Sequence, residues 1–133
     1  KPNGNFNGLS CLCVNFEDNL PDLGVVMSEV VLRHKGYNVY NTGSHAELGS
    51  LGEVIKNKKI NKILFYLCNM QCCMSVVDDN IENTEKQVKS IYNSAKKYNV
   101  DVIFGGPGIE LISNVKNYID TSFLTYKELN NLI

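Results

Sequence analysis

The sequence has neither an excess of positive charge nor a long hydrophobic run. Thirteen basic residues are offset by fourteen acidic ones, which gives a net charge of −1. A nucleic-acid surface is therefore not expected, and any contact with DNA would need another domain. The apolar runs are far shorter than the ~20 residues of a membrane-spanning helix, so we expect no membrane segment.

The sequence also has no signal-peptide pattern and no even set of cysteines. Its five cysteines are Cys11, Cys13, Cys68, Cys72 and Cys73. An odd number without a secretory signal argues against a disulfide scaffold and for reduced thiols in the cytoplasm. The spacing is not that of a standard zinc site. We expect buried structural thiols, with a thiolate metal or redox site as the alternative.

Catalytic motifs are missing as well. There is no G-x-G-x-x-G, no P-loop, no H-E-x-x-H and no set of serine, histidine and aspartate for nucleophilic catalysis. Both histidines are expected at helix ends, His34 in a last turn and His45 in a capping box. We therefore expect that the chain is not an enzyme and has neither catalytic residues nor a metal site.

What the sequence does contain is a regular alternation of apolar runs and helix-period segments. The expected strands cover residues 9–16, 37–43, 62–68, 101–108 and, weakly, 120–123. The expected helices follow them, at about 22–35, 44–59, 75–98, 109–116 and 125–133. This order predicts a doubly wound (Rossmann-like) α/β domain with five parallel strands and helices on both faces. Residues 1–8 are expected to be a linker or the edge of a longer chain, which leaves a single domain over residues 9–133.

The first expected helix repeats apolar residues at helical spacing, which predicts the face that packs on the sheet. The residues of that face are Leu23, Val26, Met27, Val30 and Val31. Gly36 suits the position after the helix, because glycine takes the left-handed conformation without steric cost. The strand at 62–68 is the most hydrophobic and is expected at the centre of the sheet.

The loops that follow the strands define where a ligand is expected. In doubly wound sheets ligands bind outside the carboxyl ends of the strands, beside the first strand. The loops expected there are 17–22, 68–75 and 105–108. Gly105 and Gly106 suit a close approach of the backbone to a ligand, with a plain strand-to-helix turn as the alternative.

On these residues the chain resembles the cobalamin-binding domain found in mutases, corrinoid methyltransferases and MerR-type light- or cobalamin-responsive regulators. That family carries D-x-H-x-x-G after the first strand, S-x-L after the third and G-G after the fourth. The matching residues here are Asn19, Pro21 and Gly24, then Cys68 and Met70, then Gly105 and Gly106. The resemblance implies a flavodoxin-like sheet with its five strands in the order 2-1-3-4-5. It also implies that these residues line a site for cobalamin or another tetrapyrrole.

The first motif departs from the family pattern in its chemistry. In the family its histidine is the lower axial ligand of cobalt, and its aspartate orients that imidazole. Pro21 stands at the histidine position and has no donor atom, and Asn19 stands at the aspartate position. The resemblance therefore implies a degenerate site, without cobalt ligation through this motif.

The resemblance leaves three alternatives for function. The first is the ligand-sensing C-terminal domain of a bacterial MerR-type transcriptional regulator, which acts through association of copies and reaches DNA through another domain. The second is the corrinoid-carrying domain of a cobalamin-dependent methyltransferase or mutase. The third is a domain that binds another cofactor, such as haem, or only protein partners. The loss of the histidine favours the first or the third, because mutase and methyltransferase chemistry needs controlled cobalt ligation.

Overall fold

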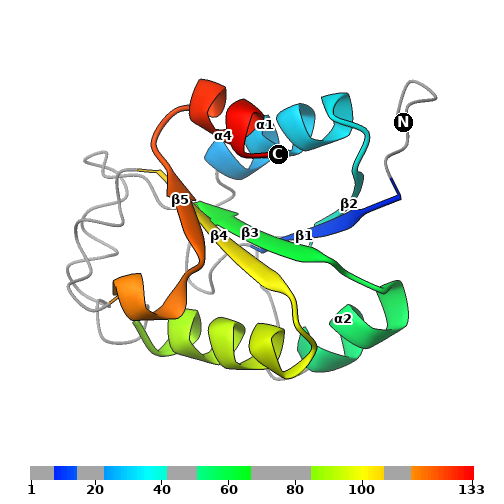
Figure 1. Ribbon diagram of the computed structural model, residues 1–133, viewed down its shortest axis with the longest axis vertical. Coiled ribbons are helices and arrows are strands. Elements are labelled where there is room, and N and C mark those ends of the chain that lie inside the picture. The colour runs from blue at the N-terminus through cyan, green and yellow to red at the C-terminus, as the bar shows by residue number, and fades with distance from the viewer. Residues whose placement is uncertain (1–7, 15–22, 42–50, 67–84, 107–114) are drawn as a thin grey trace.

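Five parallel strands form one sheet in the computed structural model, which describes residues 8–14, 23–41, 51–66, 85–106 and 115–133. The strands are β1 (Ser10–Val14), β2 (Asn38–Asn41), β3 (Lys62–Tyr66), β4 (Asp101–Gly105) and β5 (Thr121–Phe123). Their order in the sheet is β2-β1-β3-β4-β5, so the predicted topology is confirmed. β3 lies at the centre, as its hydrophobicity predicts (Figure 1).

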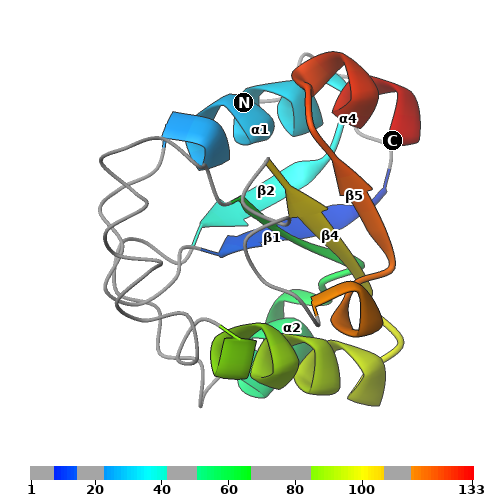
Figure 2. The same ribbon diagram turned by 90° about the vertical axis from the view of Figure 1, so that its left-hand side faces the viewer.

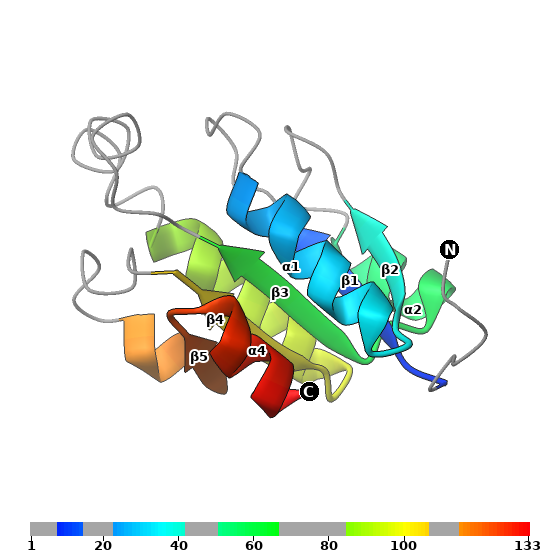
Figure 3. The ribbon, with the colours of Figure 1, turned by 90° about the horizontal axis from the view of Figure 1, so that it is seen from above.

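Helices cover both faces of the sheet, as the alternating pattern predicts. The helices on one face are α1 (Leu23–His34) and α4 (Tyr126–Leu132). The opposite face is covered by α2 (Leu51–Lys58) and by a helix over residues 85–97, and the views in Figures 2 and 3 show the same two layers. A short 3-10 helix, η3 (Val115–Tyr118), leads into β5. The predicted helix at 109–116 falls mostly outside the described residues, and 115–118 take this tighter form.

The two faces of the sheet form separate hydrophobic cores. Leu12 and Val14 of β1 pack on the α2 side, whereas Cys11 and Cys13 pack on the α1 side. Every residue of β1 is buried, which confirms the prediction of a strand covered on both faces. Burial of apolar surface stabilises each core by about 25 cal/mol per Å². The stability of the sheet therefore depends on both helical layers.

Three helices end in the same backbone turn. Gly36 has φ +92° after α1, and the N–H of Tyr37 donates to the carbonyl of Leu32 at 3.0 Å. This arrangement is a Schellman motif, so the predicted role of Gly36 is confirmed. Lys59 and Asn99 take the same left-handed conformation after α2 and after the helix over 85–97.

The predicted packing face of α1 is wrong at three of its five residues. Val26, Met27 and Val30 are exposed, with 50%, 40% and 57% of their surface accessible. Val31 is partly buried against the core on the α1 side, and the side chain of Leu23 lies outside the described part of the chain. Among the described residues of α1, Gly24, Val25, Ser28 and Leu32 are buried. The helix carries apolar residues on more than one side, so spacing alone did not identify the packed face. The small residues Gly24 and Ser28 let α1 lie close to the sheet. The buried hydroxyl of Ser28 has a hydrogen-bond partner, because Ser28 Oγ donates to the carbonyl of Gly24 at 2.7 Å.

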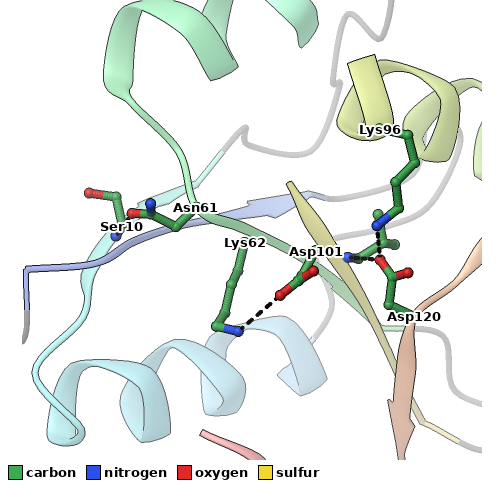
Figure 4. Close-up of polar contacts among 7 residues, drawn as sticks. Ser10, Asn61, Lys62, Lys96, Asp101 and Asp120 are labelled. Carbon is green, nitrogen blue, oxygen red and sulfur yellow. Dashed lines mark hydrogen bonds and ion pairs between the residues drawn. The ribbon is translucent and has the colours of Figure 1, made fainter. Parts of the chain in front are cut away.

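Polar side chains gather at the amino ends of the strands (Figure 4). Asp120 Oδ2 accepts hydrogen bonds from Lys96 Nζ at 2.5 Å and from the backbone N–H of Val102 at 2.8 Å. Asn61 Oδ1 accepts from the backbone N–H of Ser10 at 2.8 Å. These contacts tie β5 to β4 and β1 to the start of β3, so the polar links of the sheet lie opposite the carboxyl edge.

No helix within the described residues is both long and apolar enough to cross a membrane.

Candidate functional site

Three of the predicted site residues lie within the described part of the chain. Gly24 is in the first turn of α1, Gly105 is the last residue of β4, and Gly106 follows it. They meet at the carboxyl edge of the sheet, where a ligand is expected. The other four predicted residues, Asn19, Pro21, Cys68 and Met70, lie outside the described residues, as does His45.

Gly24 is covered by an aromatic ring of the chain itself. Tyr66 ends β3, and a Cβ atom added to Gly24 would overlap the Tyr66 ring at Cγ, Cδ1 and Cε1. Glycine at position 24 therefore admits the side chain of Tyr66. Gly24 lies in the first turn of α1, and its missing side chain makes room there for the Tyr66 ring of the protein itself.

Gly105 is covered in the same way, by a different ring. It pairs with Tyr66 of β3 on one side and with Phe123 of β5 on the other. A Cβ atom added to Gly105 would overlap the Phe123 ring. Gly106 has φ +95°, and its N–H donates to the carbonyl of Phe123 at 2.9 Å, so it forms a turn that binds β5.

Tyr66, Phe123 and Tyr126 form what we call the aromatic cluster. The ring centroids of Tyr66 and Phe123 are 6.1 Å apart, and those of Tyr66 and Tyr126 are 6.2 Å apart with planes inclined by 16°. Phe123 is buried, whereas Tyr66 and Tyr126 are half-buried. Sequence reasoning did not select these residues. The signal in the sequence that could have pointed to them is a large aromatic residue at the end of the central strand, at the edge of the sheet where ligands are expected.

The cysteines of β1 form a buried pair. Cys11 and Cys13 are both free and fully buried, and they lie on the same face of β1, on the α1 side of the sheet. A hydrogen bond with Cys11 and burial both raise the pKa of the Cys13 thiol, because each favours the protonated form. The surroundings of Cys13 therefore favour its protonated thiol.

Among the described residues, no group of three or more His, Cys, Asp or Glu side chains is placed to hold a metal ion. Cys68, Cys72 and Cys73 lie outside those residues, so the alternative of a thiolate site stays untested. His34 is exposed in the last turn of α1, as predicted.

Comparisons with known proteins agree with the fold. No protein-family profile matches the sequence, and no curated protein matches it. Among solved structures, the chain is similar to the monomethylamine corrinoid protein of Methanosarcina barkeri, with a TM-score of 0.59 and 18% sequence identity. The match covers 93% of this chain and 55% of that protein, so this chain spans about half the length of its neighbour. At this identity the likeness concerns the fold alone.

The resemblance in the site motifs implies a corrinoid, and the packing at two of the matched glycines bears on it. The Tyr66 ring occupies the place of a side chain at Gly24, and the Phe123 ring occupies that place at Gly105, both in the core on the α1 side of the sheet. The described residues therefore leave no room for a corrinoid on this side of the two glycines. Among the described residues, the surroundings of these glycines are apolar and aromatic.

Proposed function

We propose that this chain is a regulatory domain on the corrinoid-protein fold, of the kind found at the C-terminal end of MerR-type transcriptional regulators. It acts through association with protein and not through a reaction of a bound corrinoid. The observation that carries the proposal is the packing of the Tyr66 and Phe123 rings on Gly24 and Gly105, two of the positions matched to the cobalamin-binding motifs. The sequence adds to this, because Pro21 has no donor atom for cobalt. Copies of the domain pack against one another, and DNA is reached only through another domain.

A second candidate is a corrinoid-carrying domain. The similarity to the Methanosarcina barkeri corrinoid protein favours it, because that protein has the same fold over 93% of this chain. In this candidate the rings over the glycines move aside when the cofactor enters, and cobalt is held without the histidine.

One experiment separates the two candidates. The purified protein is incubated in the dark with hydroxocobalamin, adenosylcobalamin or haemin and then desalted. The absorption spectrum and the sedimentation velocity of the protein fraction are recorded. The regulatory proposal expects no retained corrin and concentration-dependent self-association. Retained corrin would support the carrier, retained haem would support an exchange of cofactor, and a colourless protein that stays monomeric would contradict the association role.

The double variant Asn19→Asp, Pro21→His provides the matched control, because it restores the motif of the axial ligand. It is expected to remain colourless with cobalamin, since the rings over the glycines are unchanged. If this variant takes up cobalamin with a histidine-ligated spectrum, the missing histidine and not the ring cover excludes the cofactor.

A further inference from the structure

The outward side of α1 carries an apolar patch, which consists of Val26, Met27 and Val30. All three side chains are exposed, and their spacing along the helix makes them neighbours on its surface. Figure 3 shows α1 on the outside of the sheet. An exposed valine costs free energy twice, because its apolar surface stays in water and its branched side chain loses rotamer freedom in a helix. Helix stability therefore does not account for the patch, whereas a partner that covers it would.

A charged pair flanks the patch. Glu29 and Arg33 lie one helical turn apart on the same side of it, and they form an ion pair of 3.6 Å within the chain. This separation is long, and 17% of the Glu29 side chain and 39% of the Arg33 side chain are exposed. A hydrogen bond from Asn41 Nδ2 to Glu29 Oε2 holds the carboxylate in place. Both charges can therefore also face a second partner.

We infer that the patch is the surface through which two copies of this chain associate, as an antiparallel pair of α1 helices with Val30 beside the twofold axis. In this pair Val30 packs against Val30 of the second copy, and Glu29 of each copy faces Arg33 of the other. The inference rests on the association in the proposed function and adds the surface and the partner to it.

The partner is a second copy because the patch is self-complementary. In a twofold interface each contact occurs twice, since residue i meets residue j and residue j meets residue i. Glu29 and Arg33 are equally far from Val31, so an antiparallel pairing about this position places the acid of each helix opposite the base of the other. The same pairing brings the two uncharged patches together, so no like charges meet at its centre.

The helices on the opposite face of the sheet are not suited to self-association. Their exposed charges are mostly basic, and the exposed lysines are Lys56, Lys58, Lys59, Lys86 and Lys97. Within the described part of these helices and the turns that follow them, Glu53 is the only exposed acidic residue. Two copies that met through this layer would place like charges opposite one another, which disfavours association.

Two charge-reversal variants, Glu29→Arg and Arg33→Glu, test the pairing by sedimentation velocity. Each variant alone places like charges opposite each other, so each is expected to be mainly monomeric at a concentration at which the unchanged chain associates. An equal mixture of the two is expected to associate again, because the two basic side chains of one variant face the two acidic side chains of the other. An ion pair that acts only within one chain predicts no recovery on mixing.

A second variant tests the apolar patch itself. Val30→Lys places a charge beside the twofold axis and is expected to weaken association by about tenfold or more. Tyr98→Lys is the matched control, because Tyr98 is also exposed and lies beside Gly52 of α2, on the opposite face of the sheet. Circular dichroism checks that the variants are folded. Since Val30 and Tyr98 are both exposed, neither change removes a core side chain.

The possible results separate this inference from the proposed function. Equal association of Val30→Lys and the unchanged chain would overturn the inference and leave the regulatory proposal standing, and so would a mixture of folded charge variants that stays monomeric. Loss of association in Tyr98→Lys alone would move the contact to the opposite layer and overturn the inference as well. An unchanged chain that stays monomeric at every concentration would contradict both. If a charge variant does not fold, Val30→Lys decides.

Discussion

Asp120 and Lys96 meet at 2.5 Å, and the same carboxylate oxygen accepts the backbone N–H of Val102. One side chain thereby links β5 to the second residue of β4 and to the helix over 85–97. Val102 is fully buried, so its backbone N–H needs a hydrogen-bond acceptor within the protein. Among the described contacts, that acceptor is the Asp120 carboxylate.

Replacing Asp120 by alanine is expected to lower the free energy of unfolding by about 1–3 kcal/mol, because the N–H of Val102 loses its acceptor. Urea unfolding at pH 7 measures the effect. Asp101→Ala is the control, since its ion pair with Lys62 is 3.5 Å long and its side chain is 61% exposed. That change should cost less than about 0.5 kcal/mol. Equal losses in the two variants would contradict the anchoring role of Asp120.

The same carboxyl group predicts a dependence on pH. Partial burial raises the pKa of Asp120, but hydrogen bonds from Lys96 and Val102 and the charge of Lys96 outweigh it, so the pKa lies below its usual value of 3.8. A group whose pKa is lower in the folded state stabilises the fold above its unfolded pKa and loses this effect as pH falls through the folded pKa. The stability difference between the unchanged chain and Asp120→Asn should therefore be constant from pH 7 to 5 and shrink below about 3.8. A difference that grows in acid would refute this assignment.

Gly105→Ala is expected to destabilise the domain, by about 1–3 kcal/mol, because the new methyl group overlaps the buried ring of Phe123. Gly52→Ala in α2 is the control. Its Cβ would lie 3.5 Å from the nearest atom of Tyr98, an ordinary contact, and alanine favours the helix by about 0.5–1 kcal/mol. Thermal unfolding should shift down for the first variant and up for the second. If both shifts have the same sign, the ring does not cover Gly105.

The corrected packing face of α1 is tested by two truncations on the same helix. Leu32→Ala removes a fully buried side chain and is expected to cost about 2–5 kcal/mol. Val30→Ala removes one that is 57% exposed and should stay within about 0.5 kcal/mol. Denaturant midpoints of the two variants give the comparison. A larger loss at Val30 would restore the face predicted from spacing.

Part of this architecture could be predicted from the sequence, and part of it could not. The alternation of apolar runs and helices predicted a parallel sheet covered on both faces, and the family resemblance implied its strand order. The left-handed turn at Gly36 followed from glycine itself. The packed face of α1 did not follow from the sequence, because paired valines place apolar groups on several sides of the helix. The ring cover over Gly105 depends on the register that aligns it with Tyr66 and Phe123, and register is a tertiary property.

The buried thiols of β1 make it possible to measure how often the fold opens locally. Cys11 and Cys13 expose no surface, and they lie in a strand that pairs with β2 on one side and β3 on the other. An alkylating reagent reaches them only when this strand separates from the layer of α1. The rate at which the β1 peptide gains mass in iodoacetamide therefore reports how often β1 separates from the α1 layer, and the natural thiols are the only probes needed.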